Sequence, residues 1–150
     1  MNIEVFNDKH ILFNDTATTQ EEAFKAIADF AKELGFVESA DAYFEGLKER
    51  ELEATTGFKD GIAIPHCKNE TVIKPGMFLV KFANPIDWNA LDGKPVSAGI
   101  ALSIPVEGAQ EHLKLLSLIA RKMIDDNFRE GIISGNDPEV LAEIINQISF

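Results

Sequence analysis

The apolar run at residues 96–104 (VSAGIALSI) is the feature that most constrains the fold of this 150-residue chain. Its apolar residues follow one another almost without interruption, which is typical of a strand buried on both faces of a sheet. Two shorter apolar runs precede it at residues 61–65 and 77–82, and residues 86–88 could add a short edge piece. Pro65 has no amide proton to donate to a ladder, so we expect the first run to end there. The sequence thus predicts a sheet covered on both sides.

Four helical patterns flank these strands, two before them and two after. The first begins with Thr19 and Glu22, which match a capping box, and Gly35 can close it in the left-handed conformation. The others begin at Ser39 and fade near residues 50–53, cover residues 111–126, and begin at Asp137-Pro138. Helices before and after a central set of strands predict an α/β sandwich. We find no linker and no internal repeat, so residues 1–150 are expected to form a single domain.

Composition excludes several classes of protein. The chain has 14 Lys and Arg against 25 Asp and Glu, a net charge of −11, which argues against a nucleic-acid partner because phosphate neutralisation needs clustered cations. No apolar run approaches the roughly 18 residues of a membrane span, and the first residues lack the order of a signal peptide. A single cysteine cannot form an internal disulfide. We therefore expect a cytoplasmic protein without direct membrane insertion.

His66 is the first candidate for chemistry. It directly follows Pro65, so its imidazole is expected at the rim of the sheet, where the chain becomes accessible. A neutral ring nitrogen is then available near pH 7 as a nucleophile, base or ligand. The alternative for the same residue is a partly buried surface histidine that only caps a strand.

Two further residues could hold an anion. His112 lies in the first turn of the helix predicted at residues 111–126, where free amides and the positive end of the helix dipole favour negative charge. Arg50 lies at the end of the second helix and could clamp a phosphoryl group with two parallel hydrogen bonds. Each has a structural alternative. His112 could be a core-edge histidine bonded to the backbone, and Arg50 a helix-end charge on last-turn carbonyls.

The other reactive side chains give weaker indications of a function. Cys67 adjoins His66, but neighbours on an extended chain point to opposite sides, so a Cys–His nucleophile is not expected. His10 has no chemistry-bearing neighbours and is interpreted as a surface residue. The three scattered histidines match no zinc-binding spacing, and neither a P-loop nor a dinucleotide-binding motif occurs, so no metal and no cofactor are expected. Any phosphoryl group would arrive on another molecule.

Three blocks carry a specific resemblance: Arg50-Glu51, residues 55–66 (TTGFKDGIAIPH) and Glu111-His112-Leu113. Together they resemble the fructose/mannitol family of enzyme IIA components (EIIA type 2) of the bacterial phosphoenolpyruvate-dependent sugar phosphotransferase system. The resemblance extends from the Thr19 capping box to the final helix. It departs at Cys67, where the family often has glycine, and at Phe58, where an aliphatic residue is expected.

The resemblance implies a mixed β-sheet flanked by helices and a phosphotransferase that needs no cofactor or metal. His66 would accept a phosphoryl group from the histidine-containing phosphocarrier protein and donate it to a IIB component, which phosphorylates a sugar entering through the IIC permease. His112 and Arg50 would steady the phosphoryl group. The sugar would be fructose, mannitol or a relative, chosen by the membrane component.

Two other functions stay open at this point. A regulatory nitrogen-type IIA protein, whose phosphorylation state controls partner proteins, would have the same length and the same site motif. A non-catalytic interaction module that has kept the fold is opposed by the presence of His66, His112 and Arg50 together.

Overall fold

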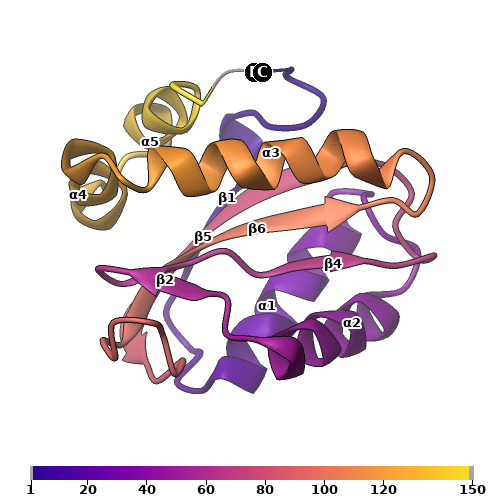
Figure 1. Ribbon diagram of the computed structural model, residues 1–150, viewed down its shortest axis with the longest axis horizontal. Coiled ribbons are helices and arrows are strands. Elements are labelled where there is room, and N and C mark those ends of the chain that lie inside the picture. The colour runs from indigo at the N-terminus through magenta and orange to yellow at the C-terminus, as the bar shows by residue number, and fades with distance from the viewer. Residues whose placement is uncertain (1, 149–150) are drawn as a thin grey trace.

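A mixed six-stranded sheet lies between two layers of helices in the computed structural model, which describes residues 2–148 (Figure 1). The elements in chain order are η1 (Asp8–His10), β1 (Ile11–Asn14), α1 (Gln20–Glu33), α2 (Ala40–Glu53), β2 (Gly57–Lys59), β3 (Ile62–Ala63), β4 (His66–Lys68), β5 (Gly76–Ile86), β6 (Val96–Ile104), α3 (Ala109–Lys122), α4 (Asp126–Ser134) and α5 (Pro138–Ile145). The expected α/β sandwich with a mixed sheet is confirmed. None of the helices among the described residues is long and apolar enough to span a bilayer.

The order of strands in the sheet is β1-β5-β6-β3-β2, and β4 also pairs with β6. The long antiparallel pair β5–β6 forms the centre, with Leu79 opposite Ile100. Parallel pairs flank it, because β1 joins β5 and both β3 and β4 join β6. The strand predicted at residues 96–104 is confirmed with the same bounds as β6.

The two faces of the sheet carry separate apolar cores, as the uninterrupted strand pattern requires. On one face, α1 and α2 bury Phe24 and Tyr43 against Phe78 of β5. On the other face, α3, α4 and α5 bury side chains such as Ile119 and Leu141 against Leu79, Ile100 and other strand residues. Figure 1 shows the same division, with α1 and α2 below the sheet and α3 to α5 above it.

The strand expected to end at Pro65 in fact resumes at once. β3 and β4 pair with β6 in one continuous register, in which Ala63 lies opposite Gly99 and His66 opposite Leu102. Pro65 cannot donate, but its carbonyl oxygen accepts the Leu102 amide at 3.0 Å, so the ladder crosses the proline. His66 is therefore the first residue of a strand rather than the residue after one.

Several caps match the sequence. Thr19 Oγ1 accepts from the Glu22 amide, and Gly35 closes α1 at a φ of +86°. The Glu22 carboxylate reaches back to the amide and hydroxyl of Thr18, one residue earlier than a capping box requires. The helix predicted at residues 111–126 ends at Lys122, because the Asp125 side chain accepts from amides of the next turn and begins α4.

The interpretation of His10 as a surface residue is wrong. Its side chain is 4% exposed, and its ring lies among the rings of Phe6, Phe36 and Phe78. Ring atom Nδ1 lies 3.0 Å from the carbonyl oxygen of Met77. Because the contacting residue is 67 positions away, nothing next to His10 in the sequence indicates this burial.

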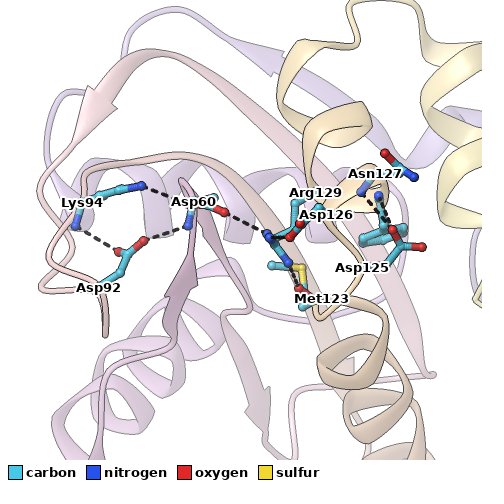
Figure 2. A network of polar contacts seen from close by, with 9 residues as sticks. Asp60, Asp92, Lys94, Met123, Asp125, Asp126, Asn127 and Arg129 are labelled. Atoms are coloured by element: carbon cyan, nitrogen blue, oxygen red, sulfur yellow. Dashed lines mark hydrogen bonds and ion pairs between the residues drawn. The ribbon is translucent and has the colours of Figure 1, made fainter.

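A polar network ties the β2–β3 turn to α4 (Figure 2). Arg129, on α4, donates from Nε to Asp60 at 3.0 Å, and its other nitrogens donate to Asp126 and to the carbonyl of Met123. Asp60 also accepts from Lys94 at 3.0 Å. This network fixes the turn of the hairpin to α4.

Candidate functional site

His66 stands at the start of β4 with each ring nitrogen engaged differently. Nδ1 lies 2.8 Å from the carbonyl oxygen of Ile64, which can only accept, so Nδ1 carries the proton. Nε2 lies 3.2 Å from Nε of Arg50, a group that can only donate, so Nε2 bears the lone pair. The two contacts fix both the tautomer and the orientation of the ring.

Arg50 reaches His66 from the last turn of α2. Its Nη1 donates to the carbonyl oxygen of Ala54 at 2.8 Å, which anchors the far side of the guanidinium to the end of its own helix. Both proposed roles of Arg50 in the sequence are thus compatible, because it satisfies a helix-end carbonyl while facing the imidazole. Among residues 2–148 it forms no salt bridge with a carboxylate.

The segment between α2 and β2 is fixed by a clamp that the sequence analysis did not identify. The Glu51 carboxylate accepts from the Thr56 amide at 2.7 Å and from the Thr56 hydroxyl at 2.5 Å. The indole of Trp88 donates to the same hydroxyl at 3.1 Å. Since Glu51 adjoins Arg50, this clamp holds the end of α2 against the sheet and steadies the arginine.

The electrostatic surroundings keep the imidazole neutral. Burial lowers the pKa of His66 below its ordinary value of 6.5, and the positive charge of Arg50 lowers it further. The bond to the Ile64 carbonyl and the charges of Glu51 and Glu53 oppose this lowering. A neutral ring near pH 7 keeps the Nε2 lone pair available to an electrophile.

His66 and Arg50 line a hollow of about 380 Å³ between α2, β4 and the start of α3. Its lining mixes both signs of charge and includes Glu49, Arg50, Glu53, His66, Lys68 and Leu113. The hollow is partly open to solvent and His66 is only half-buried, so a group on another molecule can reach the imidazole. Two other hollows, of about 420 and 450 Å³, contain no histidine.

His112 lies in the first turn of α3, half-buried. The structure brings Arg50 and His66 into direct contact, but it does not place His112 in the same hydrogen-bond network among the described residues. Its neighbour Leu113 lines the hollow instead. The helix that carries both residues follows β6, the strand that pairs with β4, so His112 lies at the same end of the sheet as the hollow. Its supporting role remains a prediction.

Cys67 behaves as a core residue. It is 4% exposed and belongs to the core under α1 and α2. Burial raises the pKa of its thiol to about 12, so no thiolate is available at neutral pH. Among residues 2–148 no three His, Cys, Asp or Glu side chains gather closely enough to hold a metal ion.

A neutral imidazole with a defined lone pair, next to a permanent cation without a carboxylate partner, suits one chemistry. The ring can accept an electrophilic group, and the guanidinium can stabilise the negative charge that a phosphoryl group brings. No general base is needed, because Nε2 carries no proton to remove. Fold and site are thus compatible with the class of proteins that carry a phosphoryl group on histidine.

Comparison with known proteins places the chain within that class. The family described as "Phosphoenolpyruvate-dependent sugar phosphotransferase system, EIIA 2" matches residues 4–148. The fructose-specific EIIA component of Haloferax volcanii is 32% identical over 138 residues, which cover 92% of this chain and 90% of that protein. The chain belongs to the EIIA 2 family and is a phosphotransferase of the sugar phosphotransferase system.

Solved structures agree. The crystal structure of the nitrogen regulatory protein IIA-Ntr from Neisseria meningitidis is 28% identical, with a TM-score of 0.86 over 95% of this chain and 97% of that one. The mannitol IIA of Escherichia coli, solved as a complex with its phosphorylated IIB, is 16% identical, with a TM-score of 0.79 over 95% and 97% of the two chains. This second likeness shows the fold alone.

Proposed function

We propose that His66 is the residue that accepts and donates the phosphoryl group, and that it does so through Nε2. The observation that carries this proposal is the pair of contacts on the ring, since Ile64 holds the Nδ1 proton and Nε2 keeps the lone pair, beside Arg50 in a residue that lines the hollow. Nε2 forms the new P–N bond as the bond from phosphorus to the donor's imidazole breaks, and the donor ring keeps that electron pair. Positioning and charge stabilisation suffice for such a transfer, so no metal or nucleotide enters.

Arg50 and His112 act as supporting donors in this proposal. The incoming phosphoryl group takes the place of Arg50 Nε at Nε2, and the guanidinium then donates to the phosphoryl oxygens. His112 adds a ring N–H from the N-terminus of α3, where the helix dipole also favours an anion. The net charge of −11 makes such donors necessary, because a phosphohistidine adds further negative charge to an acidic protein.

The partners follow from the family. We propose that the histidine-containing phosphocarrier protein supplies the group and that a IIB component receives it for uptake of a fructose- or mannitol-type sugar through a IIC permease. The fructose-specific relative supports this assignment. Residues 1–150 would act as one EIIA domain in the cytoplasm, where these partners meet.

Phosphate labelling tests the assignment. The protein is incubated with phosphoenolpyruvate, enzyme I and the phosphocarrier protein, and the acid-labile, base-stable label is mapped by mass spectrometry. We expect label on His66 alone and none in His66→Ala. Label that survives in His66→Ala, or that is found on His112, would disprove the assignment.

A regulatory role of the nitrogen type is the second candidate. The observation that favours it is the superposition on the Neisseria nitrogen regulatory protein, whose TM-score of 0.86 exceeds that of the mannitol IIA. Sugar uptake separates the two functions. A strain that lacks its fructose IIA should recover uptake with this chain but not with His66→Ala, whereas a regulatory protein should leave uptake unrestored.

A further inference from the structure

We propose that Gly46 is a positioning residue for Arg50, because its missing side chain allows α2 to lie directly on Cys67 and so sets the distance from Arg50 to His66. The inference rests on the proposed function of that pair. It concerns how the pair is held, which neither the motif nor the family match addresses.

The contact between α2 and β4 leaves no room for a side chain at position 46. A Cβ added to Gly46 would lie 2.2 Å from Sγ of Cys67 and 3.3 Å from Nδ2 of Asn69. Carbon and sulfur do not approach to 2.2 Å without a covalent bond, so either the thiol would have to rotate or one of the two elements would have to move. Glycine is a poor residue for a helix interior, where it costs conformational entropy, and the close approach explains its presence here.

The neighbour at this contact has little freedom to yield. Cys67 is 4% exposed and lies in the core formed with α1 and α2. Although Cys67 borders the hollow beside Gly46, it is packed into this core, and packed interiors resist even small changes in volume. A methyl group at position 46 is therefore expected to displace the helix rather than the thiol.

Such a displacement would be transmitted directly to the site. Arg50 follows Gly46 by four residues, one helical turn, and therefore lies on the same face of α2. On β4, His66 directly precedes Cys67. The Gly46–Cys67 contact and the 3.2 Å contact between Arg50 Nε and His66 Nε2 thus both join α2 to β4. The residues of the two contacts are one helical turn apart on α2 and adjacent on β4. Arg50 is also tied to its own helix end through Ala54, so it moves with the helix.

Gly46→Ala tests the proposal, with the double variant Gly46→Ala/Cys67→Gly as its matched control. Both variants carry the same alanine in α2, but the second lacks the sulfur that the alanine would meet. We expect Gly46→Ala to slow transfer to a IIB domain by about tenfold, since a displacement of about 1 Å can cost up to a hundredfold. The double variant should return to within about twofold of the parent.

Two further measurements separate positioning from a general loss of structure. In the Arg50→Ala background, Gly46→Ala should cause no further slowing, because a residue that acts through Arg50 has nothing left to act on. NMR titration of unphosphorylated His66 should show its pKa rising towards 6.5 in Gly46→Ala and returning in the double variant, as burial and Arg50 no longer lower it fully.

The proposal is overturned if folded Gly46→Ala transfers at the parent rate with an unchanged His66 titration, which would mean that the thiol simply rotates away. The proposal is also overturned if Gly46→Ala slows transfer as much in the Arg50→Ala background as in the parent. It is overturned as well if the double variant Gly46→Ala/Cys67→Gly shows no recovery of transfer. Failure of the proposed function is recognised separately, because label would then persist in His66→Ala, whereas the titration of His66 needs no phosphate at all.

Discussion

Arg129 and Arg50 both hold their guanidinium groups with hydrogen bonds, but they differ in the charge of their partners. Arg129 donates to two carboxylates, Asp60 and Asp126, and to a backbone carbonyl (Figure 2). Its side chain is 5% exposed. Arg50 donates instead to a neutral imidazole and to one carbonyl.

The difference shows which arginine is free to act on a ligand. The charge of Arg129 is balanced twice over within the fold, so an arriving anion would compete with carboxylates already in place. The charge of Arg50 has no carboxylate partner among residues 2–148, and it faces an open hollow. Arg129 therefore stabilises the fold, while Arg50 retains an electrostatic attraction for a phosphoryl group.

Replacing each arginine by alanine should separate the two roles. Arg129→Ala should lower the free energy of unfolding by about 2 kcal/mol, because it removes a buried guanidinium whose carboxylate partners are partly exposed and leaves the Met123 carbonyl unpaired. Urea denaturation measures this loss. The folded fraction of the variant should transfer phosphoryl groups within about twofold of the parent rate, because Arg129 lies outside the hollow. Slow transfer with full stability would reverse the assignment of the two arginines.

Arg50→Ala should show the opposite pattern. A charge-assisted hydrogen bond contributes about 1.5–3 kcal/mol, so transfer to a IIB domain should slow by about ten- to a hundredfold. The free energy of unfolding should change by no more than about 1 kcal/mol, because Arg50 is only half-buried and its bond to the Ala54 carbonyl lies at an exposed helix end. His112→Ala should slow transfer to a similar extent if it donates to the same group.

The double variant Arg50→Ala/His112→Ala should lose less than the sum of the two single losses, because both donors share one phosphoryl ligand. Circular dichroism provides the folding control for all three proteins. If both single variants transfer at the parent rate, the site proposed around His66 is wrong however well the motif matches.

The elements predicted correctly are those whose own residues carry a helix cap or a strand pattern. Caps at Thr19, Ser39 and Asp137 and the unbroken run of β6 all correspond to observed elements. Two signals were present but not used. Asp60 and Gly61 both have positive φ, as a two-residue hairpin turn between β2 and β3 requires, and Phe128 and Ile132 mark the buried face of α4.

The remaining differences depend on distant residues. β1 is a four-residue strand held by parallel pairing with β5, more than sixty positions away. Lys81 is buried at the C-terminal end of α4, where it donates to the carbonyls of Ile132, Ile133 and Gly135. In the site, the motif indicated His66 and Arg50, but the Ile64 carbonyl and the Gly46 contact are properties of the folded chain.

A second comparison, between His10 and His66, can be tested with pH. Burial lowers the pKa of both rings from 6.5, although the hydrogen bonds that the rings donate to backbone carbonyls oppose this lowering. A depressed histidine pKa means that the unfolded chain binds a proton before the folded one does, so stability falls as the pH drops below about 6.5. Each such group contributes a slope of up to about 1.4 kcal/mol per pH unit.

Urea denaturation between pH 7.5 and 5.5 should show this slope in the parent protein. His10→Gln can keep a donor to the Met77 carbonyl but cannot titrate, so its slope should be about half that of the parent, with His66 supplying the rest. An equal slope in parent and variant would mean that His10 takes up its proton in the folded state, despite the surrounding aromatic rings.

Cys67→Ser should have the smallest effect on transfer, and it contrasts Cys67 with its neighbour His66. The thiol has a pKa of about 12 and lies in the core, so no step of the transfer requires it. Serine is similar in size and should keep the spacing between α2 and β4, so transfer should stay within about threefold of the parent rate, less than 1 kcal/mol in activation free energy. The buried hydroxyl should still cost about 1 kcal/mol of stability, because it loses water on folding. A loss of transfer beyond about a hundredfold, roughly 2.7 kcal/mol, would show that the sulfur takes part in the chemistry.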